Sequence, residues 1–361
     1  MTDAGSTSPV FDLTTLTEPI VQAPLAGGPS TPELTIAVCE AGGLGFIASG
    51  YKRADAVREE IAAVRAATER PFGVNIFVPT REPADPGRLL DYLRELAPEA
   101  ARQGVDLGEP RHEDDEWEGK LELVCAEHVP VVSFTFGCPD AAVVERLHRA
   151  EIAVWVTVTR PAEALEAQSA GADALIVQGA EAGGHRGGFS DGDEAGELGL
   201  LPLLRLVTRT VPLPLIAAGG IADGAAVAAV LCAGARAAAL GTALMLCPEA
   251  GTSDAQRTLL SEPGATRLTR AFTGRLARGI VNRFMLEHSA SAPVAYPEIH
   301  HVTSLLRAAA RKRGDADAFN LWAGQAHELA LARPAGELVR DIGADARRAL
   351  REAGERLSHA G

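Results

Sequence analysis

The chain has 361 residues, of which 47% are hydrophobic and 23% charged. These proportions are typical of a folded globular protein and exclude a disordered one, and the length suits one large domain or two. The 34 basic and 48 acidic side chains give a formal net charge of −14. A chain this acidic repels nucleic-acid phosphates and anionic lipid, so we expect neither nucleic acid nor a membrane as a partner.

Five cysteines are scattered along the chain without any C-x-x-C pair: Cys39, Cys125, Cys138, Cys232 and Cys247. Their odd number and wide spacing argue against a zinc site and a disulfide framework, so we expect a cytoplasmic protein without a bound metal. The polar N-terminus lacks the order of a signal peptide. Gly234, Arg236 and Gly241 interrupt the apolar stretch 225–247, which indicates a buried helix, a turn and a strand rather than a membrane span.

Short continuous apolar runs bounded by turn residues recur along the first two thirds of the chain. They predict strands at 19–23, 45–48, 72–77, 130–134, 153–158, 174–178, 214–218 and 237–241. Helical patterns lie between them at 32–40, 54–67, 141–150, 162–170, 200–207 and 224–232. This alternation predicts the α/β class and a (β/α)8 TIM barrel, with a doubly wound sheet as the alternative.

Two segments depart from this alternation. Residues 81–128 are longer than one connection needs and contain four consecutive acidic residues, 113–116, which we expect to form a solvated face. After about residue 248 the strand signals stop, and helical spacing predominates from residue 303 onward. We therefore expect a flexible N-terminus over 1–15, a barrel over 16–248, and a mostly helical second lobe over 249–361 whose last helices pack back on the barrel.

Glycines follow the seventh and eighth predicted strands, at Gly219, Gly220 and Gly241. The chemistry of such barrels lies on the loops after the strands, and phosphate groups favour the loops after strands seven and eight. Glycine lets backbone N–H groups approach a phosphate, and the helix N-terminus that follows favours its negative charge. These loops predict a phosphate site, with Asp223 as the N-cap of the next helix rather than a ligand.

The sixth predicted strand leads into a glycine-rich loop, residues 179–188, that contains His185 and is here called the histidine loop. Two glycines before His185 allow the backbone to approach a flat ring, and an imidazole can exchange a proton near neutral pH. A catalytic role for His185 is therefore predicted. Asn75 is a polar side chain inside an apolar run, and either a ligand or a neighbouring backbone group would satisfy it.

At these residues the sequence resembles the nitronate monooxygenase family, formerly called 2-nitropropane dioxygenases. The resemblance covers most of the chain and includes residues 22–28, 42–45, 73–75, 181–187, 217–221, 241–243, 273–282 and 322–325. Its most specific motif is the E-A-G-G-H-x-G loop at 181–187. The family implies a TIM barrel that binds FMN, with a mostly helical second lobe.

The resemblance also implies which residues contact the flavin: Ala23, Pro24, Asn75, Gln178, Gly183, Gly184, Gly219, Gly220, Gly241 and Thr242. It places His185 beside the flavin ring as a base or substrate-orienting group. Many relatives carry a lysine or another long polar side chain on the fifth strand, where this chain has Thr157. The loop residues Arg275, Arg278 and Asn282 could bind an anion or tie the second lobe down, and we expect the structural role.

The implied reaction is the oxidation of an alkyl nitronate by dioxygen to a carbonyl compound and nitrite, and the expected small-molecule partner is a nitronate or nitroalkane. Flavin-dependent enoyl-acyl-carrier-protein reductases share this fold and histidine loop, so an enzyme that uses NAD(P)H is an alternative. A flavin-binding protein without turnover is a third. The sequence leaves the physiological substrate open, and also whether the chain forms a homo-oligomer.

Overall fold

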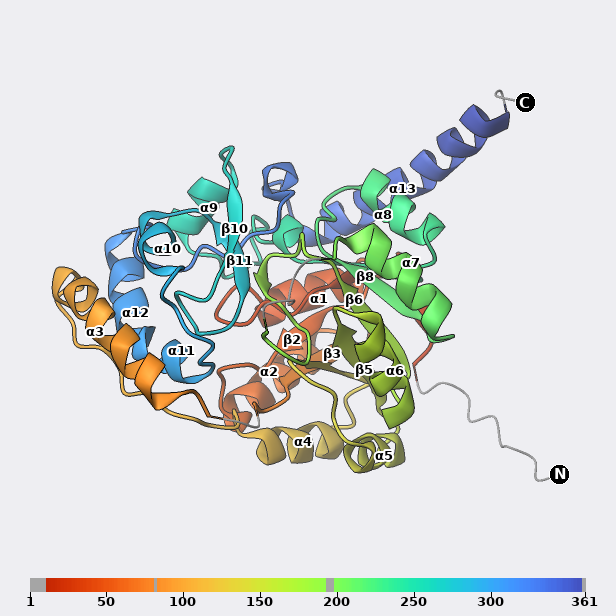
Figure 1. Cartoon of the computed structure of the whole chain (residues 1–361). Helices are drawn as coiled ribbons and strands as arrows, with labels where there is room; N and C mark the ends of the chain where they lie inside the picture. Colours follow the sequence, from red (N-terminus) through yellow and green to blue (C-terminus); the bar gives the residue numbers. More distant parts are fainter. Residues whose placement is uncertain (1–10, 81–82, 193–197, 359–361) are drawn as a thin grey trace.

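The computed structural model describes residues 11–80, 83–192 and 198–358 (Figure 1). Eight parallel strands form one sheet in the order β1-β9-β8-β6-β5-β4-β3-β2. They are β1 (Ile20–Gln22), β2 (Phe46–Ala48), β3 (Gly73–Phe77), β4 (Val131–Thr135), β5 (Ala153–Val158), β6 (Ala174–Gln178), β8 (Leu215–Ala218) and β9 (Ala237–Leu240). The backbone of Gln22 donates to Leu44 and that of Leu44 donates to Ile20, which closes β1 against the segment before β2. The closure confirms the TIM barrel and excludes the doubly wound sheet.

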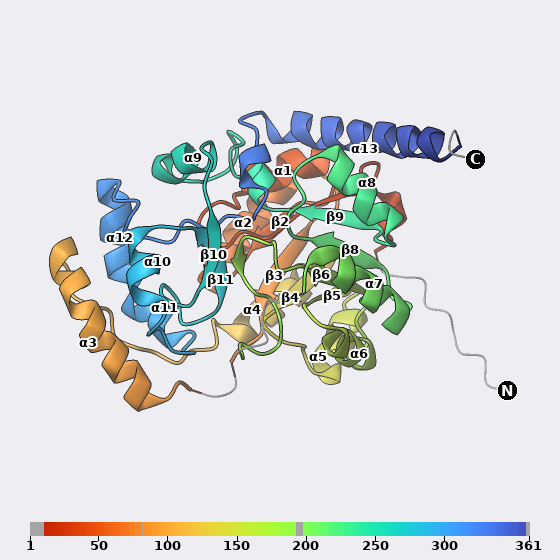
Figure 2. The same ribbon diagram turned by 45° about the horizontal axis from the view of Figure 1, so that its top comes forward.

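Helices cover the outside of the barrel between successive strands (Figure 2). They are α1 (Pro32–Glu40), α2 (Ala54–Ala67), α4 (Trp117–Ala126), α5 (Ala141–Arg149), α6 (Pro161–Ala170), α7 (Leu200–Thr210) and α8 (Gly224–Cys232). Local capping fixes where several begin: the side chains of Thr31, Asp140 and Asp223 accept from backbone N–H groups in the first turns of α1, α5 and α8. The predicted N-cap role of Asp223 is thereby confirmed.

The barrel interior is filled by side chains from alternate positions of the strands, among them Phe46, Trp155 and Ile176. Phe11 packs against Trp155 with ring centroids 6.1 Å apart, and Leu13 joins the same cluster. Residues 11–16 therefore cover the N-terminal ends of the strands. The rest of the predicted flexible terminus, residues 1–10, lies outside the described residues.

The second lobe contains α3 (Pro86–Gln103), α9 (Asp254–Leu260), α10 (Arg283–His288), α11 (Glu298–Val302) and α12 (Ser304–Arg313). It also contains a small antiparallel sheet of β10 (Thr266–Thr269), β11 (Ala277–Ile280) and β7 (Gly184–His185). The expectation that strands stop at residue 248 is wrong for β10 and β11. Each of these strands has only four residues and includes an arginine, so no long apolar run marks them.

Helix α3 lies between β3 and β4 in the chain but packs beside α12 in the second lobe (Figure 1). Its Tyr92 and Leu96 join one core with Phe272, Phe284 and Leu306. The second lobe thus takes a helix from the segment that precedes residue 248. The division of the chain at that residue stays a prediction.

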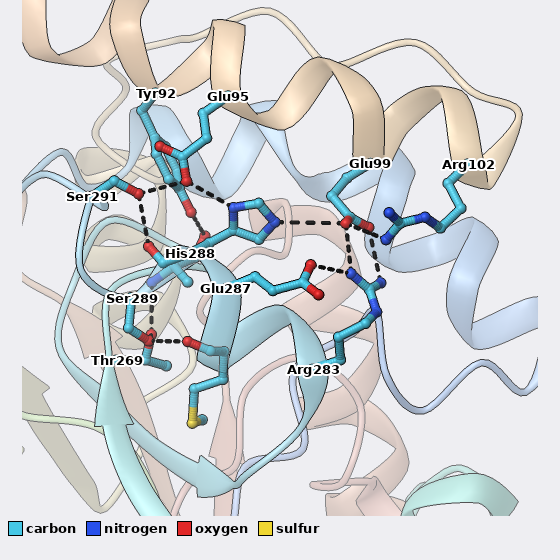
Figure 3. A network of polar contacts seen from close by, with 12 residues as sticks. Tyr92, Glu95, Glu99, Arg102, Thr269, Arg283, Glu287, His288, Ser289 and Ser291 are labelled. Atoms are coloured by element: carbon cyan, nitrogen blue, oxygen red, sulfur yellow. Dashed lines mark hydrogen bonds and ion pairs between the residues drawn. The ribbon is translucent and has the colours of Figure 1, made fainter.

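An ion-pair network joins α3 to α10 (Figure 3). The Glu99 carboxylate forms ion pairs with the guanidinium groups of Arg283, at 2.6 Å, and Arg102, at 2.5 Å. Glu287 pairs with the same Arg283 guanidinium. Burial alone would raise the pKa of Glu99, but the hydrogen bonds and charge of Arg283 outweigh it and hold that pKa below its usual range. Among the described residues, Glu99, Glu287 and His288 are close enough together to hold a metal ion, but Arg283 already bridges the two carboxylates.

The last helix, α13 (Ala335–Ser358), runs along α8 and α1 and continues past the barrel (Figure 2). Gly343 lies where this helix crosses the loop before β1, and a Cβ there would displace the Glu18 carboxylate. Arg347 then binds Glu18 with two hydrogen bonds of 2.9 Å. Within the described part of the chain, no helix is both long enough and apolar enough to cross a membrane.

The acidic stretch 113–116 is only in part the solvated face that its composition suggests. Glu113 and Asp114 are exposed, whereas Asp115 lies 2.6 Å from the buried Nζ of Lys120 and accepts a hydrogen bond from the backbone of Tyr51. Glu116 accepts from the backbone of Ala54 at the start of α2. Two of the four carboxylates therefore organise the loop between β2 and α2.

Candidate active site

A cavity of about 410 Å³ opens where the carboxyl ends of the barrel strands meet the second lobe. Its lining includes His185 and every residue that the resemblance implies as a flavin contact: Ala23, Pro24, Asn75, Gln178, Gly183, Gly184, Gly219, Gly220, Gly241 and Thr242. These residues are up to 219 positions apart, from Ala23 to Thr242, and the barrel brings them together because parallel strands end on one side. Their roles toward a cofactor stay predictions.

The loop after β8 has the geometry of an anion cradle. Gly219 and Gly220 both have left-handed backbone conformations, with φ of +114° and +67°. Among the described residues, no acceptor faces the backbone N–H groups of Gly219, Gly220 and Ile221. They precede the N-terminus of α8, where the helix dipole adds positive potential. These donors, beside Gly241 and Thr242 of the next loop, fit the phosphate of a flavin nucleotide.

Asn75 and Gln178 hold parts of the site in place. The Asn75 side-chain nitrogen donates to the Ser133 and Thr135 hydroxyls, each at 2.9 Å, so a neighbouring strand satisfies it. The side-chain oxygen of Gln178 accepts hydrogen bonds from the Arg186 guanidinium at 2.9 Å and from the backbone N–H of Gly187 at 2.8 Å. Its side-chain nitrogen donates to the backbone carbonyl of His185 at 3.0 Å. Gln178 therefore fixes the course of the histidine loop.

His185 is held between the barrel and the second lobe. Its backbone pairs with Ala277 of β11, and its ring lies 5.5 to 5.8 Å from the rings of Phe136, Tyr296 and Trp322. Its Nε2 lies 2.8 Å from the hydroxyl of Thr273. Burial, followed by the positive charges of Arg275 and Arg307, lowers the pKa of His185 from 6.5 to about 3. The imidazole is therefore neutral at physiological pH.

The second lobe contributes cavity residues that no sequence motif predicts. Arg307 and Arg311, one turn apart on α12, line it together with His300, whereas no aspartate or glutamate of the described chain is among its lining residues. Arg307 is held by Thr303, Asn320 and His300, all neutral, and burial lowers its pKa to about 10. This end of the cavity is therefore positively charged and suits an anion.

Arg275, Arg278 and Asn282 make structural contacts. Arg278 donates to the Ala180 carbonyl at 2.8 Å, and Asn282 caps α10 and donates to the carbonyls of Ala316 and Phe319. The Arg275 guanidinium donates to the backbone carbonyls of Arg186 and Gly188 in the histidine loop. Its central carbon lies 4.2 Å from the centroid of the Phe136 ring. These contacts agree with the expected structural role.

Thr157 lines the cavity from β5, where its hydroxyl lies 3.4 Å from that of Thr135. The histidine loop packs directly on it, because a Cβ at Gly187 would lie 2.6 Å from the Thr157 methyl group. The short side chain of Thr157 leaves room for this contact and brings no charge. The positive charges of the cavity come from α12 instead.

A closed parallel barrel with a histidine in the cavity at its carboxyl mouth defines an enzyme of the (β/α)8 class. The sequence profile of the nitronate monooxygenase family matches residues 8–345. A nitronate monooxygenase of Pseudomonas aeruginosa is 42% identical over 90% of this chain and 95% of its own length, and one of Paraburkholderia phytofirmans is 39% identical over 95% and 96%. The chain belongs to the nitronate monooxygenase family, as its resemblance predicts, and is a flavin-dependent oxidoreductase that acts on a small molecule.

Solved structures agree with this assignment. A nitroalkane oxidase from Streptomyces ansochromogenes is 50% identical, with a TM-score of 0.91 over 94% of this chain and 99% of that one. The structure of FabK from Thermotoga maritima is 27% identical, with a TM-score of 0.73 over 97% and 98%. Both likenesses extend over the barrel and the second lobe together.

Proposed function

We propose that this protein uses FMN and dioxygen to oxidise alkyl nitronates to carbonyl compounds and nitrite. The observation that carries the proposal is the composition of one cavity. It joins a glycine cradle for a phosphate, a neutral histidine and two arginines, and its described lining contains no carboxylate. A nitronate is a small anion, so such a cavity favours it over a cation or a neutral molecule of the same size.

The predicted cofactor contacts fit this arrangement. The N–H groups after β8 would hold the FMN phosphate, and the glycines of the histidine loop would let its backbone approach the ring. The bound flavin would supply the redox chemistry, taking electrons from the nitronate and passing them to dioxygen. The chain's own part is to bind, to orient and to exclude other reactions.

The residues around His185 orient the substrate. The rings of Phe136, Tyr296 and Trp322 pack around the imidazole and restrict its orientation. Arg307 and Arg311 attract the negative charge of the nitronate from the second-lobe side. The lowered pKa of His185 keeps a third positive charge out of the cavity, so the imidazole meets the substrate in its neutral form.

A visible spectrum followed under anaerobic conditions tests the proposal. The purified protein should be yellow, with one FMN per chain, and a nitronate should bleach it while NADPH does not. Nitrite should then form when air is admitted. Bleaching by NADPH alone would favour the enoyl reductase, and a flavin that responds to neither compound would favour a binding protein without turnover.

A further inference from the structure

The hydroxyl of Thr273 lies between His185 and a backbone carbonyl. It is 2.8 Å from Nε2 of His185 and donates at 3.3 Å to the carbonyl oxygen of Arg275. Thr273 is only 1% exposed, so no bulk water competes for these contacts. A tight turn fixes its position, because the backbones of Thr273 and Gly274 both donate to the carbonyl of Arg270.

The hydrogen bonds around Thr273 favour one tautomer of neutral His185. The Thr273 hydroxyl has one proton and the Arg275 carbonyl can only accept. If the hydroxyl donated to His185, the buried Arg275 carbonyl would lose its only donor among the described residues. If Nε2–H donates to the hydroxyl and the hydroxyl donates to the carbonyl, all three groups are satisfied.

We propose that Thr273 is a positioning residue that holds the proton of neutral His185 on Nε2 and thereby presents a bare Nδ1 to the substrate. Nδ1 has no hydrogen-bond partner within the described residues, whereas the ring itself lines the cavity. The Arg275 side chain donates to the backbone carbonyl of Arg186, so residue 275 is tied to the neighbour of His185. This chain of contacts links the tautomer of His185 to the turn before β11.

A bare Nδ1 is a proton acceptor, which extends the proposed function to neutral nitroalkanes. Nδ1 would take the proton from the carbon next to the nitro group, and the electron pair of that C–H bond would stay with the substrate as a nitronate. The imidazole becomes a cation and the substrate an anion, so charge is balanced. Burial and the charges of Arg275 and Arg307 disfavour an isolated imidazolium, so the step depends on the anion that forms beside it, which the same positive charges favour. A protonated Nδ1 could not perform this step.

The tautomer can be measured without turnover. In NMR of the flavin-loaded protein with isotope-labelled histidine, the His185 signals are those absent from His185→Asn. We expect one protonated nitrogen, Nε2, and one bare nitrogen, Nδ1, in the wild type and in Thr273→Ser, and a mixture in Thr273→Val. A protonated Nδ1 in the wild type would overturn the proposal even if the protein oxidises nitronates as proposed above.

Kinetics supply the second measurement, which depends on the proposed function. Thr273→Val should lower kcat/KM for a neutral nitroalkane about tenfold, the order expected for one buried hydrogen bond, and Thr273→Ser should restore it. Preformed nitronates, which need no proton removed, should change by about twofold or less. Thr269→Val is the control, because it removes a buried hydroxyl that bonds Ser289 outside the cavity. Equal losses of kcat/KM for both substrates in Thr273→Val would make Thr273 merely structural. If the wild type does not use neutral nitroalkanes, the NMR measurement of the tautomer alone tests the proposal.

Discussion

Tyr51 of the barrel and His300 of the second lobe stack ring on ring, with centroids 4.0 Å apart and planes 6° from parallel. Tyr51 follows β2 with a left-handed backbone, φ +67°, and its N–H donates to Asp115. Asp115 in turn pairs with the buried ammonium of Lys120. One wall of the cavity therefore depends on a buried ion pair on the outer side of the barrel.

Breaking that ion pair should destabilise the protein. Asp115→Asn leaves the Lys120 ammonium, 1% exposed, without its counter-charge, and we expect a loss of about 3 kcal/mol in the free energy of unfolding. The double variant Asp115→Asn with Lys120→Met removes the stranded charge and should recover most of that loss. Urea denaturation of the three proteins measures this, and equal stability of the single and double variants would contradict it.

Replacing Gly220 should remove the flavin. A valine there would be strained at φ +67°, and its Cβ would lie 3.0 Å from that of Glu181, so the loop after β8 would shift away from the phosphate. Gly314→Val is the matched control, because Gly314 has φ +69° at the end of α12, with open space around it. Absorbance at equal protein concentration should show flavin lost only from Gly220→Val. Full flavin content in that variant would show that the phosphate lies elsewhere.

The positive end of the cavity should act on substrate affinity. Arg311→Gln removes one of the two charges that line it, and we expect KM for a nitronate to rise about tenfold, with kcat changed less. Lys312→Gln, the next residue on the same helix, removes an exposed charge outside the cavity and should leave KM unchanged. A rise of the same size in both variants would point to a general effect of net charge instead.

His185→Asn should keep the flavin but lose turnover. We expect rates with neutral nitroalkanes to fall about 10²–10⁴-fold, and those with preformed nitronates to fall less because their proton is already gone. Near-normal nitronate turnover together with retained FMN would leave His185 as a structural residue of its loop.

The lowered pKa of His185 also predicts how the protein responds to acid. The folded histidine stays neutral down to about pH 3, so rates that need it neutral should not fall as pH drops through 6.5. The unfolded chain binds a proton there below pH 6.5, so folding stability should decline from that pH toward 3. His185→Asn should lack this part of the decline. The prediction would be contradicted by an activity loss centred near pH 6.5 that persists when each of the other histidines is replaced, because His185 would then be the group that titrates there.

Arg278 should matter more for stability than for catalysis. Arg278→Ala deprives the carbonyl of Ala180 of a charged donor at 2.8 Å, which should cost about 1–3 kcal/mol. Arg278 does not line the cavity in the described structure, so KM should change little. Thermal unfolding and steady-state kinetics separate the two effects, and a raised KM at unchanged Tm would move this loop into the substrate site.

The amino-acid sequence by itself determined the barrel and one half of its cavity. The barrel strands are mostly apolar, because both of their faces are covered, and such runs are visible without any tertiary information. The glycines after β8 and the loop that carries His185 follow strand ends, and parallel strands place all their carboxyl ends at one mouth. Once the fold is known, these residues must meet.

Only the tertiary structure decided what faces them from the second lobe. Arg307 and Arg311 lie on an amphipathic helix whose sequence does not tell which side meets the barrel, and Thr273 lies in a turn more than 80 residues from His185. Strands β10 and β11 are too short and too polar to be recognised, and α3 leaves the barrel to pack on α12. Contacts between segments so far apart in the chain depend on how two lobes dock, and local periodicity records only which face of each element is buried.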